Sequence, residues 1–394
     1  MLITADTVLT GRDLLRPGWI DIAAGTVRAI GSGAPAAPAD HRLGAVTVVP
    51  GFVDTHTHGG GGTDFSTTAQ PDIAHSARLH LRHGTTTLVA SLVSAAPEDL
   101  VAQIGALRAA VEADVIAGIH LEGPWLAATR CGAHDPSVLR DPEPAELQRV
   151  LAAGGGTIRM VTLAPERAGG LDAVRRIAGA GAVVAVGHTE ATYERTQAAI
   201  NAGATVGTHL FNAMRPIHQR EPGPVIALLE DPRVTVELIT DGVHVHPALY
   251  REVRRSAGPD RVSLITDAMA AAGMPDGRYR LGSLAVDVRD GTARVSGSDT
   301  IAGSTATMDR VFRFAVTRSG LDRDDALRLA VRMATVNPAR ALGLPEAGLV
   351  PGAVANLVVL DPALEVTGVL HRGAWVIQPS RGEPSRGEAD GFSG

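Results

Sequence analysis

Two histidines separated by one residue, His56 and His58, are the first residues along the chain whose types and spacing could bind a metal. They follow a largely apolar run and precede four consecutive glycines. Because side chains alternate along an extended backbone, both imidazoles point to the same side of the expected strand. Two imidazoles that converge at a strand end could hold one cation. A polar loop that happens to contain histidines is the structural alternative.

The elements that would position these histidines are apolar runs that alternate with helix-like patterns. The expected strands are residues 46–54, 86–93, 115–122, 158–165, 183–188, 205–210, 234–240 and 262–267. Eight β-then-α units in about 220 residues predict an α/β fold, a (β/α)8 TIM-like barrel. A doubly wound open sheet is the alternative. After the eighth run, residues 278–295 are expected to form an inserted β-hairpin.

The carboxyl ends of barrel strands share one mouth, so residues that end different strands converge there. The residues at those ends are His56, His58, Glu122, His188, His209 and Asp267. For one such residue alone, a structural histidine or a helix cap explains the pattern equally well, but the whole set predicts a metal site. A bound divalent cation lowers the pKa of water to about 7. Asp267 would accept the water's proton and pass it to the leaving group.

The other histidines of the central region are expected to have no role in the chemistry. His120 lies two residues before Glu122 and shares its face, so we expect a buried packing residue one layer deeper. His75, His80 and His83 fall on or just after an expected helix that faces away from the mouth. We expect these three histidines to be solvated or to lie at an interface.

The chain contains 36 cationic residues, and all of them are arginine. The absence of lysine excludes a lysine Schiff base, a Walker-type phosphate lysine and a carboxylated lysine that bridges two metals. A bridging oxygen ligand must therefore come from aspartate or glutamate. A phosphate must be bound by arginine, histidine or backbone amides.

The composition describes an ordinary soluble protein, with 45% hydrophobic residues and a formal net charge of −6. Dispersed arginines and the lack of a long apolar stretch indicate neither a nucleic-acid partner nor a membrane partner. The single cysteine, Cys131, fits a reducing compartment, so a cytoplasmic location is expected. The expected parts are residues 1–45 and 346–378, which pair into a small β-sandwich domain, the catalytic barrel at 46–345, and a disordered tail at 379–394.

The order of the candidate ligands, in a barrel flanked by a β-domain from both termini, resembles the amidohydrolase superfamily. Several segments resemble more narrowly the N-acetylglucosamine-6-phosphate deacetylase family. They are GIHLEGPW at 118–125, GHT at 187–189, THLFNAM at 208–214, REPG at 220–223, DGVH at 241–244 and TDAM at 266–269. The resemblance runs essentially from end to end. It implies hydrolysis of N-acetyl-D-glucosamine 6-phosphate to D-glucosamine 6-phosphate and acetate, in amino-sugar catabolism and cell-wall sugar recycling.

The resemblance also implies how the metal is bound. Glu122, His188 and His209 would hold the principal ion, with Glu122 in the place that carboxylated lysine fills in many superfamily members. Because the chain keeps both His56 and His58, a second ion is possible. Zn²⁺ is the expected metal, and Fe²⁺, Mn²⁺ or Co²⁺ are alternatives.

For the substrate, the resemblance implies three groups of contacts. His134 would help to polarise the acetamide carbonyl, with Ala133 beside it, and Asp267 would act as the acid–base group. The residues expected to hold the sugar phosphate or to contact the sugar are Asn212, Ala213, Arg220, His244, Ile301, Ala302 and Gly303. In the family, the arginine at the position of Arg220 is often supplied across a dimer interface, which implies a homodimer.

Several other functions stay open on the sequence alone. A deacetylase for N-acetylgalactosamine 6-phosphate is the nearest alternative, followed by a D-aminoacylase or a cyclic amidase. Arg220 and His244 favour a phosphorylated substrate over the last two. A catalytically inactive relative that serves as an assembly module is a further alternative, although the ligand set with Asp267 is intact.

Overall fold

The structure, a computed structural model, describes residues 1–345 and 347–379. The chain divides into two compact units. One unit combines Met1–Gly51 with Gly348–Gly394, and the other is Phe52–Ala347. The domain limits derived from the sequence stay our proposal. The expected tail at 379–394 lies outside the described residues, apart from residue 379.

The larger unit is built around a sheet of eight parallel strands in the order β17-β16-β15-β14-β13-β12-β11-β8. The strands are β8 (Phe52–Thr57), β11 (Thr85–Leu92), β12 (Gly118–Glu122), β13 (Ile158–Leu163), β14 (Val183–Val186), β15 (Ala204–Gly207), β16 (Thr235–Ile239) and β17 (Val262–Ile265). The sheet nearly closes, because Thr57 forms a parallel bridge with Ala268 just after β17. The expected barrel is therefore confirmed.

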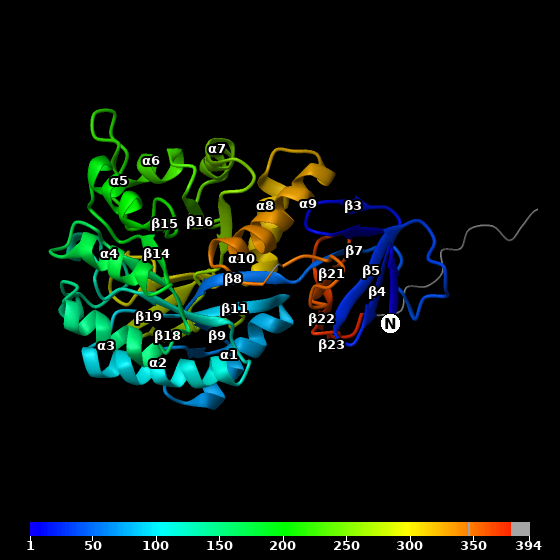
Figure 1. Ribbon diagram of the computed structural model, residues 1–394, viewed down its shortest axis with the longest axis horizontal. Helices are drawn as coiled ribbons and strands as arrows, with labels where there is room; N and C mark the ends of the chain where they lie inside the picture. Colours follow the sequence, from blue (N-terminus) through cyan, green and yellow to red (C-terminus); the bar gives the residue numbers. More distant parts are fainter. Residues whose placement is uncertain (346, 380–394) are drawn as a thin grey trace, which may run out of the picture. The chain divides into compact units, whose positions relative to one another are not determined.

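Helices lie between consecutive strands and after the last strand, β17, and they surround the sheet (Figure 1). They are α1 (Gln70–Arg82), α2 (Pro97–Glu112), α3 (Pro144–Gly154), α4 (Gly170–Gly179), α5 (Tyr193–Ala202), α6 (Gly223–Glu230), α7 (Pro247–Ala257), α8 (Met308–Arg318), α9 (Arg323–Val331) and α10 (Asn337–Ala341). In α4, Ala173, Val174 and Ile177 are buried at helical spacing, whereas Arg175 and Arg176 are exposed. This helix thus buries one apolar face and leaves its charged face exposed.

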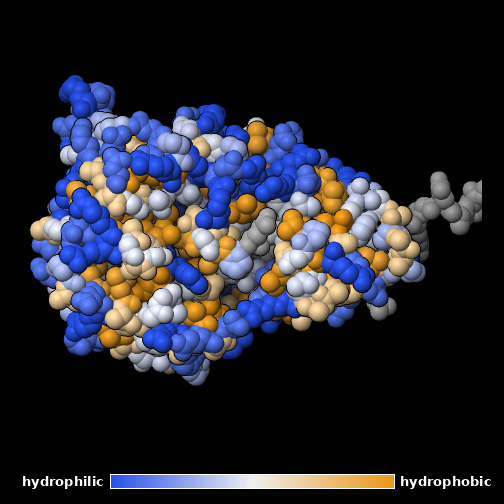
Figure 2. All heavy atoms as spheres, in the orientation of Figure 1, coloured by the Kyte–Doolittle hydropathy of each residue, from blue (hydrophilic) through white to orange (hydrophobic). Residues whose placement is uncertain are grey.

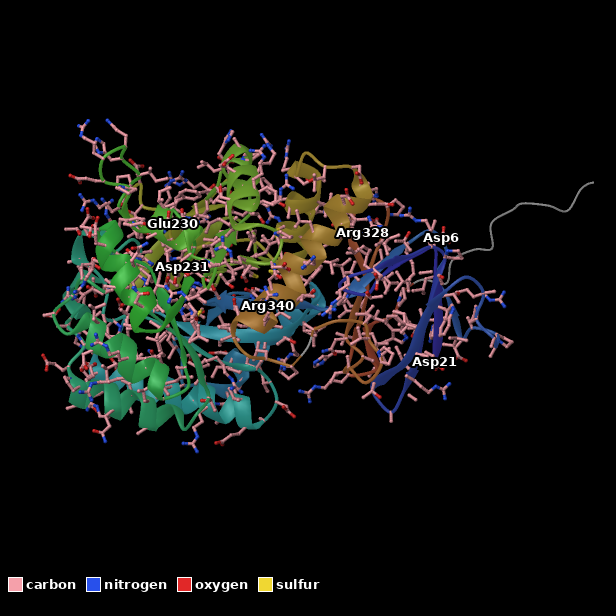
Figure 3. All side chains as sticks on the ribbon, turned by 45° about the horizontal axis from the view of Figure 1, so that its top comes forward. Asp6, Asp21, Glu230, Asp231, Arg328 and Arg340 are labelled. Carbon is pink, nitrogen blue, oxygen red and sulfur yellow. The ribbon has the colours of Figure 1, made fainter. Side chains whose placement is uncertain are left out.

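The outer surface of the helices is charged. Glu230 on α6 and Arg340 on α10, both exposed, are labelled in Figure 3. Figure 2 shows hydrophilic and hydrophobic side chains interspersed over the face in view. Among the described residues, no helix has both the length and the apolar character needed to cross a bilayer.

The smaller unit contains two sheets, in the orders β5-β4-β1-β6 and β23-β22-β21-β7-β2-β3. Its strands are β1 (Leu2–Ala5), β2 (Thr7–Leu9), β3 (Leu14–Leu15), β4 (Gly18–Ala23), β5 (Thr26–Ser32), β6 (His41–Arg42), β7 (Thr47–Pro50), β21 (Leu357–Leu360), β22 (Val366–His371) and β23 (Ala374–Ile377). Both ends of the chain contribute to its core, which includes Ile3, Ile20, Leu357 and Leu370. The expected β-domain from both termini is confirmed.

Two elements differ from the expectation. The run at 46–54 is not one strand, because β7 pairs with β21 in the smaller unit and β8 pairs with β11 in the barrel. Both strands are fully buried, so their apolar character continues across Gly51 and cannot reveal the division. The insert after β17 has three antiparallel strands, which are β18 (Gly277–Leu281), β19 (Leu284–Arg289) and β20 (Thr292–Val295).

Candidate metal and active site

The strand ends bring all of the predicted metal ligands together at one end of the barrel. His56 lies in β8 and His58 directly follows it, Glu122 ends β12, and the other three residues follow the ends of their strands. The buried polar residues include His56, His58, Glu122, His188, His209 and Asp267. A cluster of six ionisable side chains with so little exposure is costly unless its members are paired or bind a cation.

Three of these residues adopt an unusual backbone conformation directly after their strands. The φ angles are 48° at His188, 26° at His209 and 48° at Asp267. A residue other than glycine in this left-handed region costs on the order of 1–3 kcal/mol. The turn directs each side chain back over the strand ends, and such local strain is typical of functional sites.

Glu122 lies at the centre of the cluster. Its Oε1 lies 2.9 Å from Nε2 of His209 and 3.0 Å from Nε2 of His188. Its Oε2 lies 3.1 Å from Nε2 of His58 and 3.2 Å from Nε2 of His134. One carboxylate therefore links two sets of imidazoles, one at each oxygen.

The second set of possible ligands surrounds Asp267. Nε2 of His56 and Nε2 of His58 are 3.1 Å apart. Oδ1 of Asp267 lies 3.3 Å from the first nitrogen and 3.2 Å from the second. His56, His58, Glu122 and Asp267 thus form one group of converging donor atoms that could hold a metal ion.

The donor atoms fit a divalent metal. Nε2 of His188 and Nε2 of His209 face one another at 3.1 Å, as do the Nε2 atoms of His56 and His58. Two nitrogen lone pairs at this distance repel each other unless a proton or a cation lies nearby. Mixed imidazole and carboxylate donors suit Zn²⁺, and related first-row metals accept the same types of ligand.

The charges of the cluster also favour a cation. Burial raises the pKa of Glu122, but His56 and His188 outweigh this effect and hold the pKa well below its usual range. In the same way, His56 and His58 lower the pKa of Asp267 to about 2 despite its burial. Both carboxylates are therefore anionic at neutral pH and attract either protons on the imidazoles or a metal.

His188 and His134 illustrate how the partner of one ring nitrogen determines the use of the other. Nδ1 of His188 lies 2.9 Å from the carbonyl oxygen of Arg130, which can only accept, so Nδ1 carries a proton and Nε2 is the nitrogen that can bind either a second proton or a metal. Nδ1 of His134 accepts from the N–H of Ser94 at 3.2 Å, so its Nε2 carries the proton. The His134 ring is therefore arranged as a hydrogen-bond donor and not as a ligand.

The protonation state of His134 supports this assignment. Burial lowers the pKa of His134 to about 4, although the hydrogen bond to Glu122 opposes the effect. The ring is neutral at physiological pH and keeps one proton on Nε2. A neutral imidazole donor beside the cluster can polarise a carbonyl oxygen without adding a charge.

Some of the residues expected to bind the substrate lie close to this cluster. Ala133 and Ala302 pack in one hydrophobic cluster. The N–H of Ser304 donates to the carbonyl oxygen of Asp267 at 2.7 Å, which brings residues 301–303 beside Asp267. A Cβ atom at Gly303 would lie 2.8 Å from that same carbonyl oxygen, so only glycine fits here.

The residues expected near the phosphate differ in their surroundings. Nδ1 of His244 lies 2.8 Å from Oδ2 of Asp241, and this pairing raises the pKa of His244 although burial lowers it. Asn212 and Ala213 follow β15, where Asn212 donates from Nδ2 to the carbonyl oxygen of His209 at 3.1 Å. Arg220 is exposed on the loop between β15 and α6, which projects from the barrel (Figure 1). No described contact brings Arg220 to the cluster.

Two buried carboxylates beside the cluster were missed by the sequence analysis. Asp54 accepts from Oγ1 of Thr266 at 2.5 Å, and burial raises its pKa to about 7. Glu237 lies in β16, and its Oε2 is 3.3 Å from Nδ1 of His56. The sequence does contain a signal for them, since positions 54 and 237 are acidic residues inside apolar runs. A carboxylate in such a run is expected to be buried, and a buried carboxylate needs a polar partner.

The expectation for His80 was wrong. This histidine is buried, and its Nε2 lies 2.9 Å from the carbonyl oxygen of Gly59, directly after the His56 and His58 pair. The helix α1 turns one polar side chain toward the barrel, which its apolar pattern could not reveal. His120, in contrast, is buried as expected, with its ring centroid 4.4 Å from that of His56.

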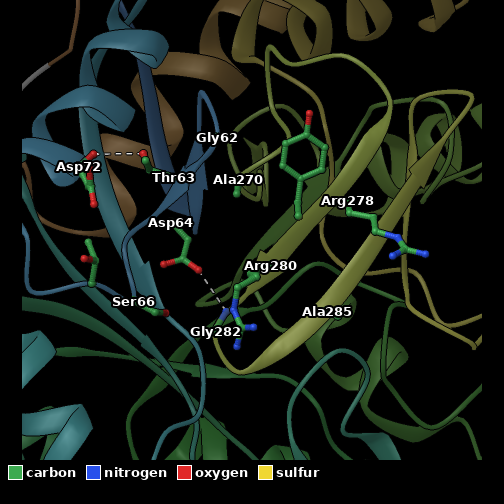
Figure 4. A pocket seen from close by; sticks show the side chains of 12 residues that line it. Gly62, Thr63, Asp64, Ser66, Asp72, Ala270, Arg278, Arg280, Gly282 and Ala285 are labelled. Atoms are coloured by element: carbon green, nitrogen blue, oxygen red, sulfur yellow. Dashed lines mark hydrogen bonds between the residues drawn. The ribbon is translucent and has the colours of Figure 1, made fainter.

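A separate hollow lies beside the inserted sheet (Figure 4). Its volume is about 750 Å³, and its lining includes Asp64, Arg278 and Arg280. Asp64 accepts from the N–H of Gly282 at 3.3 Å and so ties β10 (Thr63–Asp64) to the turn between β18 and β19. None of the predicted metal or substrate ligands lines this hollow, so the expected chemistry does not take place there.

A parallel barrel with histidines and carboxylates at its strand ends defines a class of metal-dependent hydrolases. The model of the amidohydrolase family matches residues 47–382, and this chain belongs to that family. A solved structure of an aspartate-to-alanine mutant of N-acetyl-D-glucosamine-6-phosphate deacetylase from Mycobacterium smegmatis, in complex with N-acetyl-D-glucosamine 6-phosphate, is 65% identical. Its TM-score is 0.95, and the match covers 96% of this chain and 99% of that chain.

Two characterised relatives are similar over most of their length. The N-acetylgalactosamine-6-phosphate deacetylase of Escherichia coli O157:H7 is 38% identical over 380 residues, 93% of this chain and 98% of the relative. The N-acetylglucosamine-6-phosphate deacetylase of Homo sapiens is 37% identical over 358 residues, 86% of each chain. The resemblance inferred from the sequence motifs is confirmed.

Proposed function

We propose that this protein hydrolyses N-acetyl-D-glucosamine 6-phosphate to D-glucosamine 6-phosphate and acetate. The observation that carries the proposal is the intact cluster in which Glu122 links two sets of imidazoles beside Asp267. The relative of known structure at 65% identity is named for this activity and was solved with this sugar phosphate. An enzyme that had lost its activity would be expected to show gaps in the ligand set.

We assign to these residues the following roles in metal binding and in proton transfer. Glu122, His188 and His209 would hold one ion, and His56, His58 and Asp267 would surround a second one, with Zn²⁺ as the proposed metal. When bound, such a cation supplies Lewis acidity, which polarises a carbonyl and makes water more acidic. Asp267 accepts a proton from the attacking water and transfers it to the nitrogen of the leaving amine. His134 donates from Nε2 to the carbonyl oxygen as negative charge develops there.

Recognition of the phosphate would use the groups that a chain without lysine can offer. His244, the side-chain amide of Asn212 and backbone N–H groups near Ala213 lie on loops that follow the strands. We place Arg220 at the phosphate of a neighbouring subunit, because its loop projects from the barrel and the residue is exposed. The proposed assembly is a cytoplasmic homodimer in which each site is completed by the partner.

Deacetylation of N-acetylgalactosamine 6-phosphate is the second candidate function. It is supported by the relative from Escherichia coli O157:H7, which carries that name and is 38% identical. The two sugars differ only in the configuration of the hydroxyl at C4. Discrimination therefore depends on one hydrogen-bonding position, which can be worth a large factor when the partner group is buried.

A substrate panel at fixed metal concentration tests the proposal. Acetate release is measured with the 6-phosphates of N-acetylglucosamine and N-acetylgalactosamine, and with unphosphorylated N-acetylglucosamine. We expect the highest kcat/KM for N-acetylglucosamine 6-phosphate and a much lower value for the unphosphorylated sugar. A preference for the galacto isomer would support the second candidate. Equal rates with and without the phosphate would contradict the proposed phosphate site.

A further inference from the structure

Glu237 is a buried carboxylate in a barrel strand, with an apolar residue on either side of it along the chain. It lies in the middle of β16 between two buried apolar residues and is itself only 1% exposed. A carboxylate in such surroundings costs several kcal/mol unless it accepts hydrogen bonds. Its side-chain partners in the described part of the chain are Nδ1 of His56 and Oγ1 of Thr55, both at 3.3 Å.

We propose that Glu237 is a positioning residue that holds the His56 ring with its proton on Nδ1 and its Nε2 lone pair toward the metal. The inference rests on the proposed function only in that a metal binds between His56, His58 and Asp267. A carboxylate acceptor behind a ligating imidazole fixes both the tautomer and the orientation of the ring and increases its basicity. Thr55 donates to Oε1, which leaves Oε2 directed at His56.

Two other histidines of the same site support this interpretation. Behind His188 lies a carbonyl oxygen, which leaves Nε2 free to bind, whereas behind His134 lies a backbone N–H, which makes Nε2 a donor. In these two histidines, the partner behind the ring determines what the imidazole does, whereas Nδ1 of His58 and Nδ1 of His209 have no hydrogen-bond partner among the described residues. His56 lies in a fully buried position without access to solvent, so Glu237 has to supply the acceptor that water supplies elsewhere.

The geometry argues against two simpler roles for Glu237. It contacts Nδ1 of His56, whereas the converging donors, Nε2 of His58 at 3.1 Å and Oδ1 of Asp267 at 3.3 Å, contact Nε2. Glu237 therefore lies behind the ring and is not itself a metal ligand. Packing alone does not explain it either, because leucine or valine would fill a position in an apolar strand without the cost of burying a carboxylate.

The test compares metal binding in three variants of the full-length, metal-stripped protein. Glu237→Leu removes the acceptor, and Glu237→Gln keeps an amide oxygen that can still accept from Nδ1. Ser263→Ala is the matched control. Ser263 lies opposite Glu237 on the neighbouring strand and is buried, and its hydroxyl has no hydrogen-bond partner among the described residues.

Zinc affinity is measured by calorimetry and by competition with a chelator, and melting temperatures show that each variant is folded. We expect Glu237→Leu to weaken one of two zinc-binding steps by about 10–100-fold and to leave the other unchanged. Glu237→Gln should lose only part of that affinity, and Ser263→Ala should bind as the wild type does. Anomalous diffraction should show the lost occupancy between His56, His58 and Asp267.

The inference is overturned if a folded Glu237→Leu protein keeps both affinities, or if it loses both equally. A measurement on the wild type covers the case in which Glu237→Leu does not fold. In zinc-loaded protein labelled with ¹⁵N-histidine, and assigned with His56→Gln, Nδ1 of His56 must be the protonated nitrogen. An unprotonated Nδ1 contradicts the inference.

These readouts separate the inference from the proposed activity. Binding of two ions, only one of which is weakened by Glu237→Leu, without release of acetate from any sugar of the panel, would refute the activity and support the positioning role. Normal deacetylation with metal binding that does not depend on Glu237 would support the proposed activity and refute the positioning role.

Discussion

The two halves of the metal cluster reach their geometry by different routes. His56 lies in β8 and His58 directly follows its last residue, so the strand alternation sends both rings to the same side. His188 and His209 follow their strands, and their rings are directed by left-handed turns with φ of 48° and 26°. The imidazoles of the first half are thus positioned by a strand, whereas those of the second half, like Asp267, are positioned by local backbone strain.

The support behind each half differs in the same way. His56 is backed by the side chain of Glu237 from another strand, whereas His188 is backed by the carbonyl oxygen of Arg130. A side-chain support can be removed by mutation without a change in the backbone, but a carbonyl support cannot. The comparison predicts that metal binding by the half at His56 can be weakened separately. A change at Glu122, in contrast, should affect metal binding by both halves.

The largest effect is expected at Glu122, because its two oxygens contact both halves. Glu122→Gln keeps the shape but removes the charge that attracts both ions. We expect most of the bound metal to be lost on dialysis and acetate release to fall by at least about 10³-fold, since Lewis acidity is worth several kcal/mol. Metal analysis with a circular dichroism spectrum checks this result. Nearly normal metal content would show that Glu122 does not join the halves.

Asp267 belongs to the first half by position, but its proposed role is proton transfer. Asp267→Asn keeps the shape and one acceptor oxygen but cannot take up a proton at neutral pH. Turnover should fall by roughly 10²–10⁴-fold while most of the metal is retained. Single-turnover acetate release and metal analysis on the same sample distinguish the two roles. If turnover were close to normal, Asp267 would have no part in the mechanism.

Removal of the imidazoles of the first half tests its independence directly. In His56→Asn combined with His58→Asn, the ion at Glu122, His188 and His209 should remain. The metal content after dialysis should fall to about half of that of a wild type that binds two ions, because only one of the two donor sets loses its imidazoles. His41→Asn in the smaller unit is the control. Complete loss of metal would mean that both histidines belong to a single site.

Arg220 lies outside both halves and should affect binding rather than chemistry. Arg220→Ala should raise KM for the phosphorylated sugar by roughly 10–150-fold, because one charge-assisted contact is worth about 1.5–3 kcal/mol. It should change the slow hydrolysis of the unphosphorylated sugar far less. Arg233→Ala, at another exposed arginine, is the control. An unchanged KM would remove Arg220 from the phosphate site.

The same variant tests whether the arginine acts across a dimer. Arg220→Ala and Asp267→Asn subunits are mixed under conditions in which subunits exchange. If the arginine acts on its neighbour's site, each mixed dimer has one site with both groups intact, and part of the activity returns. If exchange occurs without recovery, Arg220 does not act across the interface.

The smallest effect on activity at neutral pH is expected at His80, which lies behind the first half. Burial lowers the pKa of His80 to about 4. Below pH 6.5, the ordinary pKa of histidine, His80 takes up a proton in the unfolded chain but not in the folded chain. The free energy of unfolding therefore decreases as the pH falls from 6.5 to 4. The loss is at most about 3 kcal/mol. Urea unfolding across this range should show a flatter pH dependence for His80→Gln than for the wild type or His75→Gln. An equally steep dependence would show that His80 does not titrate as described.

Most of the fold and the convergence of the candidate ligands could be predicted from the sequence, because they depend on local patterns. Apolar runs that alternate with helical patterns predict the barrel, and ligand types at the ends of those runs predict the mouth. His56, His58 and Glu122 lie within or at the end of strands, so alternation alone indicates the direction of their side chains.

Other features are not local, and only the tertiary structure determined them. The division of the apolar run at Gly51 depends on which sheet each half joins, and both halves are equally buried. The burial of His80 depends on the loop that packs over α1. Glu237 meets His56 only because the barrel closes and brings together residues that are 181 positions apart. The sequence thus determined which side chains can hold a metal, whereas barrel closure decided which neighbours orient them, because hydrogen bonds between distant strands leave no periodic signal along the chain.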